Sequence, residues 1–141
     1  MQHHGSGGFY AVADKLLYTD SDNPARKLTG FAQAGLGDYR VDRFASYLGA
    51  GLTAPGLIAN RAADELGLAV AYARNGSHYM NAQRTQGLPV ANAETAIELT
   101  YLVQVSSWFA IQPDLQYVVT PNTTPTISNA WAFQVRFEMS F

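Results

Sequence analysis

The last eleven residues of the chain alternate between large apolar side chains and small or polar ones. The apolar set is Trp131, Phe133, Val135, Phe137, Met139 and Phe141, and the set between them is Ala132, Gln134, Arg136, Glu138 and Ser140. A period of two places each set on one face of an extended strand, whereas the same apolar residues would scatter around a helix. The pattern predicts a β-strand with one apolar and one wet face.

The same alternation recurs upstream, in residues 94–105 and 109–120. Each run has about the 9–11 residues that a tilted strand needs to cross a bilayer. Pro113 lies inside its run, and because proline has no N–H we expect a bulge or a local gap in pairing there. Four further strands are predicted at 8–18, 28–37, 44–52 and 66–73, which makes seven. The faces of 8–18 stay unassigned, since Asp14 and Lys15 fall on opposite faces, and those of 28–37 (LTGFAQAGLG) are ambiguous.

The segments between these strands predict an orientation. The longest is 75–93, a polar stretch that contains Gly, Asn and Pro and that we expect to be a loop. Outer-membrane barrels have long outer loops and short periplasmic turns. If the chain ends in the periplasm, segments 38–42, 75–93 and 121–129 lie outside. Segments 19–27, 54–63 and 106–107 then lie on the periplasmic side.

Composition supports an amphipathic sheet in lipid. Of the 141 residues, 48% are hydrophobic and only 14% are charged, against a soluble norm of roughly 25%. Mean hydropathy is nevertheless only −0.08. These values are typical of a sheet with one face toward lipid and the other toward water. We therefore expect an all-β fold of antiparallel amphipathic strands, part of a transmembrane β-barrel.

Charge and residue content exclude several classes of protein. The net charge of −2 leaves no basic patch for nucleic acid, and without cysteine there is no disulfide or thiolate site. No apolar run approaches the roughly 18 residues of a spanning helix. The first residues, MQHHGSGG, are not a signal peptide. Residues 1–7 are expected to be a disordered end, and 8–141 the barrel segment.

Polar side chains gather on the second face of the last three predicted strands. They are Glu94, Glu98, Gln104, Gln112, Asp114, Gln116, Gln134, Arg136 and Glu138, with Arg136 the only cation. In a closed barrel this set would line the lumen, while the residues from Trp131 to Phe141 would face the membrane. Carboxylates and amides exchange hydrogen bonds with hydroxyl groups as water does, which suits neutral polyhydroxy solutes. The alternative is a solvated sheet face whose polar residues merely stay wet.

Aromatic residues near the strand ends have three possible roles. Trp108, Phe109 and Trp131 would form the interfacial girdle of a barrel or the core of a soluble sandwich. Stacking on a sugar ring is the third role, and it requires a side chain that faces the lumen. Tyr10 and Tyr47 are candidates for it.

Nothing in the chain supports catalysis. His3 and His4 lie in a Gly- and Ser-rich start that indicates a disordered end or a cloning remnant, and His78 lies in the longest loop without a neighbouring carboxylate. Glu94 and Glu98 are about 13 Å apart on a strand, too far for a glycosidase pair. No phosphate-binding motif or nucleophile elbow is present. We expect no enzyme, no cofactor and no metal site.

Three stretches and the terminal strand resemble the carbohydrate-selective porins of the OprB family. The stretches are 8–18 (GFYAVADKLLY), 56–76 (GLIANRAADELGLAVAYARNG) and 94–121 (ETAIELTYLVQVSSWFAIQPDLQYVVTP). The resemblance covers nearly the whole chain from about Gly8 and concerns the C-terminal part of the family's barrel. It implies a passive channel for monosaccharides in the outer membrane of a Gram-negative bacterium, without catalysis or cofactor.

The resemblance also implies roles for individual residues. Arg61 and Asp64 match a family motif at a turn, where we expect a structural ion pair. The terminal Phe141 resembles the signal read by the barrel assembly machinery. The expected partners are neutral sugars, outer-membrane lipid and this machinery.

Seven strands are too few to close an aqueous channel, since such porins have roughly 16–18. The leading hypothesis is therefore a C-terminal fragment of a sugar-conducting porin. Many Ala and Gly on the presumed inner faces of the first strands suit a barrel that is not filled by side chains. One alternative is a small closed barrel, completed by an eighth strand, with a structural or adhesive role. Another is a soluble β-sandwich that acts as a binding module.

Overall fold

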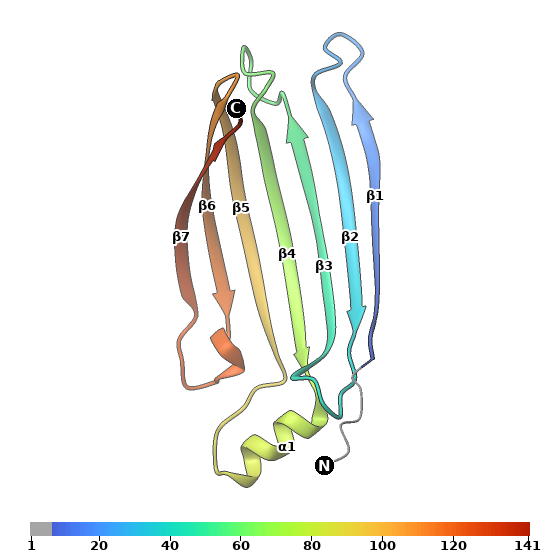
Figure 1. Ribbon diagram of the computed structural model, residues 1–141, viewed down its shortest axis with the longest axis vertical. Helices are drawn as coiled ribbons and strands as arrows, with labels where there is room; N and C mark the ends of the chain where they lie inside the picture. The colour runs from blue at the N-terminus through green and yellow to red at the C-terminus, as the bar shows by residue number, and fades with distance from the viewer. Residues whose placement is uncertain (1–6) are drawn as a thin grey trace.

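One antiparallel sheet makes up most of the molecule in the computed structural model, which describes residues 7–141 (Figure 1). Its seven strands pair in sequence order from β1 to β7. They are β1 (Phe9–Thr19), β2 (Lys27–Leu36), β3 (Phe44–Pro55), β4 (Glu65–Asn75), β5 (Ala93–Ser106), β6 (Phe109–Val119) and β7 (Ala130–Met139). The predicted all-β fold and the strand number are confirmed. A disordered end was expected at residues 1–7, and residues 1–6 of it lie outside the described part of the chain.

The connections fall at the two ends of the sheet as predicted. Segments 37–43, 76–92 and 120–129 lie together at the lower end of Figure 1, and segments 20–26, 56–64 and 107–108 at the upper end. The prediction that 75–93 is only a loop is wrong, because Ser77–Thr85 form the helix α1. None of its residues is buried. A polar helix without an apolar stripe gives no periodic signal in the sequence.

Pro113 interrupts pairing on one side of β6 only. It pairs normally with Val135 of β7, whereas the ladder to β5 skips the positions between Thr100↔Asp114 and Val103↔Ile111. The register is the same on both sides of this gap. A local gap in pairing, rather than a bulge, therefore absorbs the missing N–H.

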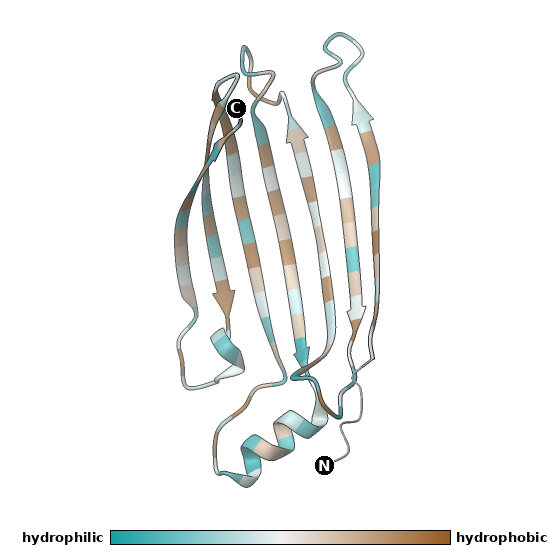
Figure 2. Cartoon of the chain, viewed as in Figure 1, coloured by the Kyte–Doolittle hydropathy of each residue, from teal (hydrophilic) through white to brown (hydrophobic). Residues whose placement is uncertain are grey.

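The distribution of buried residues is the reverse of that in a soluble domain. Among the described residues the only buried hydrophobic side chain is Ala110, whereas four polar ones are buried: Asp64, Asn75, Asp114 and Thr123. Large apolar side chains are exposed along all seven strands. Figure 2 shows the resulting alternation of brown and teal bands along the strands. Exposed apolar surface of this extent marks a face that meets lipid or a partner.

The cross-strand pairs define two faces, named here the polar face and the apolar face. The polar face carries Glu98 and Asp114, and the apolar face carries Leu99 and Phe133. Pairing extends these faces to the first strands, where Asp14 joins the polar face and Lys15 the apolar one. The two faces that the sequence left unassigned are thereby resolved.

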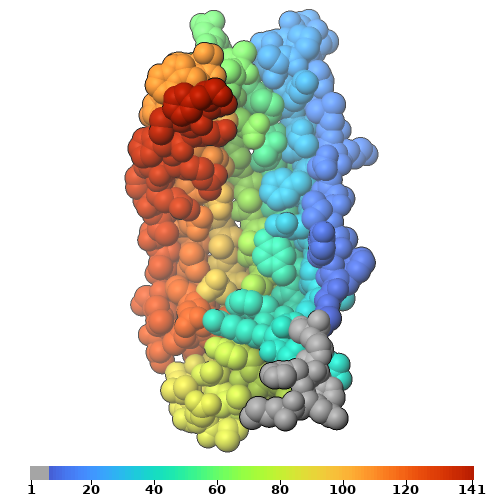
Figure 3. Space-filling view, viewed as in Figure 1, coloured from blue at the N-terminus to red at the C-terminus, as the bar shows by residue number. Residues whose placement is uncertain are grey.

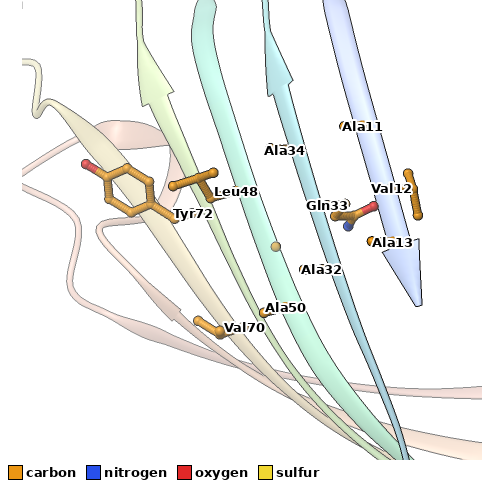
Figure 4. Close-up of a pocket in the computed structure, with 11 residues that line it drawn as sticks. Ala11, Val12, Ala13, Ala32, Gln33, Ala34, Leu48, Ala50, Val70 and Tyr72 are labelled. Atoms are coloured by element: carbon orange, nitrogen blue, oxygen red, sulfur yellow. The ribbon is translucent and has the colours of Figure 1, made fainter. Parts of the chain in front are cut away.

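Small residues of the first strands lie on the apolar face. Ala11, Ala13, Ala32, Ala34 and Ala50 line a shallow depression of about 500 Å³ there, bordered by larger side chains such as Tyr72 (Figure 4). The sequence left the faces of the first two strands unassigned, so the placement of their alanines comes from the strand pairing. The small residues presumed to lie on the inner face in the next two strands share the polar face: Gly49, Gly51, Gly67, Ala69, Ala71 and Ala73.

Within residues 7–141 the sheet is open. β1 and β7 are its edges and do not pair with each other, and no second sheet packs on either face. The fold is that of a partial barrel, so neither the closed eight-stranded barrel nor the β-sandwich describes it. In the described part of the chain, no helix has the length and apolar character needed to cross a membrane.

Candidate functional site

The polar face of β5, β6 and β7 brings the predicted polar residues into rows across the three strands. Glu98 lies opposite Gln116, Asp114 opposite Gln134, and Gln112 opposite Arg136. Paired residues of neighbouring strands have their side chains on the same face, about 5 Å apart. The period-two pattern of three separate segments therefore becomes one continuous polar surface.

Hydrogen bonds link these rows. Gln116 Nε2 donates to Glu98 Oε2 at 3.1 Å, and Gln134 Nε2 donates to Asp114 Oδ1 at 3.4 Å. Each amide thus donates to a carboxylate of the neighbouring strand. Asp114 is only 5% exposed, because the side chains around it cover it.

The one cation of this surface lies at the end of a short chain of donors. Arg136 Nη1 donates to Gln112 Oε1 at 3.1 Å, and Gln112 Nε2 donates to Thr100 Oγ1 at 2.7 Å. Thr100 in turn donates to the carbonyl oxygen of Pro113 at 3.3 Å. Thr100 was not singled out from the sequence, although it lies in the polar set of its strand. The gap in pairing beside Pro113 leaves that carbonyl free to accept.

The other predicted polar residues lie toward the ends of the sheet. Glu94, at the start of β5, accepts a hydrogen bond from the backbone N–H of Asn122. Gln104 turns to the opposite end and donates to the carbonyl oxygen of Ser106 at 2.6 Å. Glu138 lies in register with Ala110 on the polar face. These three residues therefore share the face but are outside the central rows.

Apolar side chains continue the apolar face to the C-terminus. In β7 they are Trp131, Phe133, Val135, Phe137 and Met139, all exposed, and Phe141 follows the strand. Tyr117 lies against Trp131 with ring centroids 4.7 Å apart. Trp108 lies near Phe141 at 6.4 Å. Aromatic pairs therefore lie near both ends of this edge of the sheet.

Aromatic residues also occupy the polar face of β1, β2 and β3. The register aligns Tyr10 with Gly35 and Gly35 with Tyr47, so both tyrosines of the sequence analysis belong to this face. Gln33 Nε2 donates to Tyr47 Oη at 2.8 Å. A Cβ at Gly51 would come 2.5 Å from Cζ of Phe31, so the glycine leaves room for that ring. The sequence did not predict Phe31 as a residue of the polar face, because the faces of segment 28–37 were ambiguous.

The turn between β3 and β4 holds a buried carboxylate. Arg61 Nε lies 2.7 Å from Asp64 Oδ2, and Asp64 is 3% exposed. The same carboxylate accepts from Tyr101 Oη at 2.6 Å and from the N–H of Gln104 at 3.0 Å. Burial by itself would raise the pKa of Asp64, but the hydrogen bonds from Tyr101, Arg61 and Gln104 outweigh it and lower the pKa below its usual range.

Histidine and acidic residues do not assemble into a reactive centre in residues 7–141. His78 lies exposed in α1, with its ring 6.2 Å from that of Tyr39. No group of three or more His, Cys, Asp or Glu side chains in this range could hold a metal ion. His3 and His4 lie outside the described residues.

A comparison with known protein families places the chain in one of them. A family model matches residues 1–141, and it is described as "Carbohydrate-selective porin, OprB family". The chain belongs to the OprB family. The family resemblance inferred from the motifs is thereby confirmed.

Individual relatives agree with this membership. The chain is 24% identical over 147 residues to Porin B of Pseudomonas aeruginosa. The match covers 95% of this chain and 32% of Porin B. Its fold is similar to a structure described as "High pH structure of Pseudomonas putida OprB", with a TM-score of 0.87 and 23% identity. That match covers 95% of this chain and 35% of the other. The chain thus spans about a third of the length of these relatives.

Proposed function

We propose that the seven strands form part of the wall of an outer-membrane channel through which neutral sugars, such as monosaccharides, diffuse passively. In this proposal the apolar face contacts lipid and the polar face lines the water-filled lumen. Membership of a carbohydrate-selective porin family supports a channel rather than an enzyme. The orientation follows the loops: segments 37–43, 76–92 and 120–129 face outward and Phe141 faces the periplasm and the assembly machinery.

The reversed burial is the observation that carries this proposal. A bilayer favours large exposed apolar side chains on one face, and water in a lumen solvates carboxylates and amides on the other. Further strands must pair with β1 and β7, because an unpaired backbone group in lipid costs several kcal/mol. A barrel of roughly 16–18 strands would then enclose an aqueous channel.

The chemistry of the polar face supports a neutral solute. In β5, β6 and β7 it carries the carboxylates Glu94, Glu98, Asp114 and Glu138 against the single cation Arg136. This negative excess disfavours anions in a narrow lumen. The amides and carboxylates already exchange hydrogen bonds with each other. Sugar hydroxyl groups both donate and accept, so they can replace either partner.

Neighbouring residues of β6 offer a matched test of the two faces. Cysteine is introduced at Gln116 or at Leu115 in a full-length porin that has no other cysteine, and labelling by a membrane-impermeant maleimide is measured in liposomes. We expect Gln116→Cys to react and Leu115→Cys to stay unlabelled. Equal labelling of both variants would exclude the proposed orientation of the sheet.

Sugar transport is tested on the same preparation. Single-channel current of the full-length porin is recorded in planar bilayers before and after addition of glucose, and glucose entry into liposomes is followed in parallel. We expect glucose to reduce the ion current and to enter the liposomes. A channel that conducts ions but shows neither effect would refute the sugar proposal and leave the wall assignment intact.

A further inference from the structure

Three connections meet at the lower end of the sheet, the end that carries α1. They are the β2–β3 loop (37–43), the β4–β5 connection (76–92) and the β6–β7 loop (120–129). Figure 3 shows the cyan β2–β3 loop reaching across the foot of the sheet. This junction is not part of the polar rows, and nothing in the sequence predicted that its three connections meet.

The β6–β7 loop begins with a strained segment. Thr120, Asn122 and Thr123 have φ angles of 55°, 56° and 53°, in the left-handed region. Such angles are uncommon for residues other than glycine and unfavourable for β-branched threonine. Backbone of this kind persists only where surrounding contacts hold it in place. The contacts around residues 120–123 therefore decide the shape of the loop.

Arg43 makes the longest-range of these contacts. Its Nη2 donates to the carbonyl oxygen of Asn122 at 2.9 Å and to Thr123 Oγ1 at 3.3 Å. The guanidinium carbon lies 5.0 Å from the ring centroid of Tyr79 in α1 and 4.9 Å from that of Phe44. A planar guanidinium can stack on rings while it donates at its edge. One side chain thus joins all three connections.

The same segment is held from its other side by the last residue of β4 and by the β4–β5 connection. Asn75, 2% exposed, donates through Nδ2 to Thr123 Oγ1 at 2.8 Å and to the carbonyl oxygen of Ala91 at 3.0 Å. The N–H of Ala91 donates to the carbonyl oxygen of Thr123 at 2.8 Å. The N–H of Asn122 donates to Glu94, which belongs to the polar face. The strained segment therefore touches the surface proposed to line the channel.

We propose that Arg43 is a positioning residue that holds the strained segment 120–123 against Glu94 and so keeps this mouth of the channel open to solutes. The inference rests on the proposed channel function. Removing the guanidinium takes away two hydrogen bonds that oppose the relaxation of the left-handed backbone. The loop then leaves its position beside Glu94 and moves intermittently into the solute path.

Variants of two arginines in the same loop separate this role from a general loss of charge. Arg43→Ala and Arg43→Lys remove the planar donor group, because an ammonium cannot reproduce its stacked, edge-donating geometry. Arg40→Ala is the matched control: the exposed Arg40 side chain donates through Nε and Nη2 to Asp38 of its own loop, at 2.9 Å. None of these residues takes part in the strand pairing of the sheet.

The readout is the frequency of closures of the full-length porin in planar bilayers, with the folded fraction measured by the heat-dependent shift on gels. We expect Arg43→Ala and Arg43→Lys to close several-fold more often than the parent and Arg40→Ala to match the parent. The folded fraction should be the same in all variants. Closure frequencies of Arg43→Ala equal to those of Arg40→Ala would overturn the inference.

A rescue experiment tests the strain itself. Thr120→Gly leaves the groups that contact Arg43 and Glu94 unchanged and removes the cost of the positive φ at one of the two strained threonines. In the Arg43→Ala background this substitution should return the closure frequency to that of the parent. Failure of this rescue, with the folded fraction unchanged, would contradict the role of strain.

Proteolysis of the β6–β7 loop tests the positioning role of Arg43 independently of sugar transport. Cleavage within 120–129 of the folded full-length porin should be several-fold faster in Arg43→Ala than in Arg40→Ala. Equal cleavage would overturn the positioning role even if the protein conducts no sugar. Faster cleavage in a protein that does not conduct would support the loop contact and refute only the proposed channel.

Discussion

Asp64 offers the sharpest test of how the sheet is held together. Its carboxylate lies in the β3–β4 turn, yet two of its three hydrogen-bond donors, Tyr101 and Gln104, belong to β5. The third donor, Arg61, lies in the same turn. Replacing Asp64 by alanine therefore removes an acceptor that joins the turn to a strand about 40 positions away.

The expected magnitude follows from the fate of each donor. Arg61 is partly exposed and can turn to water, so its loss contributes little. The hydroxyl of Tyr101 and the N–H of Gln104 stay in the partly buried surface without their charged acceptor. Hydrogen bonds to charged groups contribute about 1.5–3 kcal/mol, so Asp64→Ala should lower the free energy of unfolding by about 3 kcal/mol. Asp64→Asn keeps one acceptor oxygen and should cost about half of that.

The assay is urea unfolding of the full-length porin refolded in detergent micelles, with Asp22→Ala as the control. Asp22 is an exposed aspartate at the same end of the sheet. A loss below about 0.5 kcal/mol for Asp64→Ala, the usual range of surface substitutions, would refute the reasoning.

The pH dependence gives a second check on Asp64. Its pKa is lowered in the folded state, so it contributes stability above its unfolded pKa of about 3.9. That contribution is lost as the pH falls through the folded value. The difference in stability between the parent and Asp64→Asn should therefore be constant from about pH 8 to 5 and shrink below about pH 4. A difference that grows on acidification would contradict the assignment.

Two further substitutions test close packing and the loop junction, each measured by urea unfolding of the full-length porin. Gly51→Ala should cost about 1–3 kcal/mol, because the added Cβ would lie 2.7 Å from a carbonyl oxygen of β4. Gly35→Ala on the same face meets only contacts of 3.8 Å or more and should be nearly neutral. Asn75→Ala should cost about 1–3 kcal/mol, because removing its buried amide takes one donor from Thr123 Oγ1 and from the carbonyl oxygen of Ala91. Asn92→Ala, at an exposed position of the β4–β5 connection, should leave the free energy of unfolding nearly unchanged.

The final three strands could be predicted closely because two different solvents act on their faces. Lipid and water reward opposite residue types, so the period of two in residues 94–141 defines both the strand and its faces. The rows that join Glu98 to Gln116 and Gln112 to Arg136 follow from that pattern once the strands pair in order. The polar surface was therefore visible in the sequence, apart from Thr100.

The first strands carry less information, because alanine and glycine are compatible with either solvent. Only pairing with β3 and β4 assigned the alanines of β1 and β2 to the apolar face and Tyr10, Phe31 and Tyr47 to the polar one. The helix α1 was missed for a related reason, since a polar helix on the surface has no apolar stripe.

The sequence by itself determined an amphipathic all-β chain, the positions of its strands, the order of its connections and the family to which it belongs. The tertiary structure alone decided which loops meet. Arg43 and Thr123 lie 80 positions apart, and Asn75 and Thr123 lie 48 apart. Local periodicity reports the solvent on each side of a strand, but contacts between loops depend on the register of all the strands between them. For this reason no pattern in the sequence predicts the buried polar junction of the β2–β3, β4–β5 and β6–β7 connections.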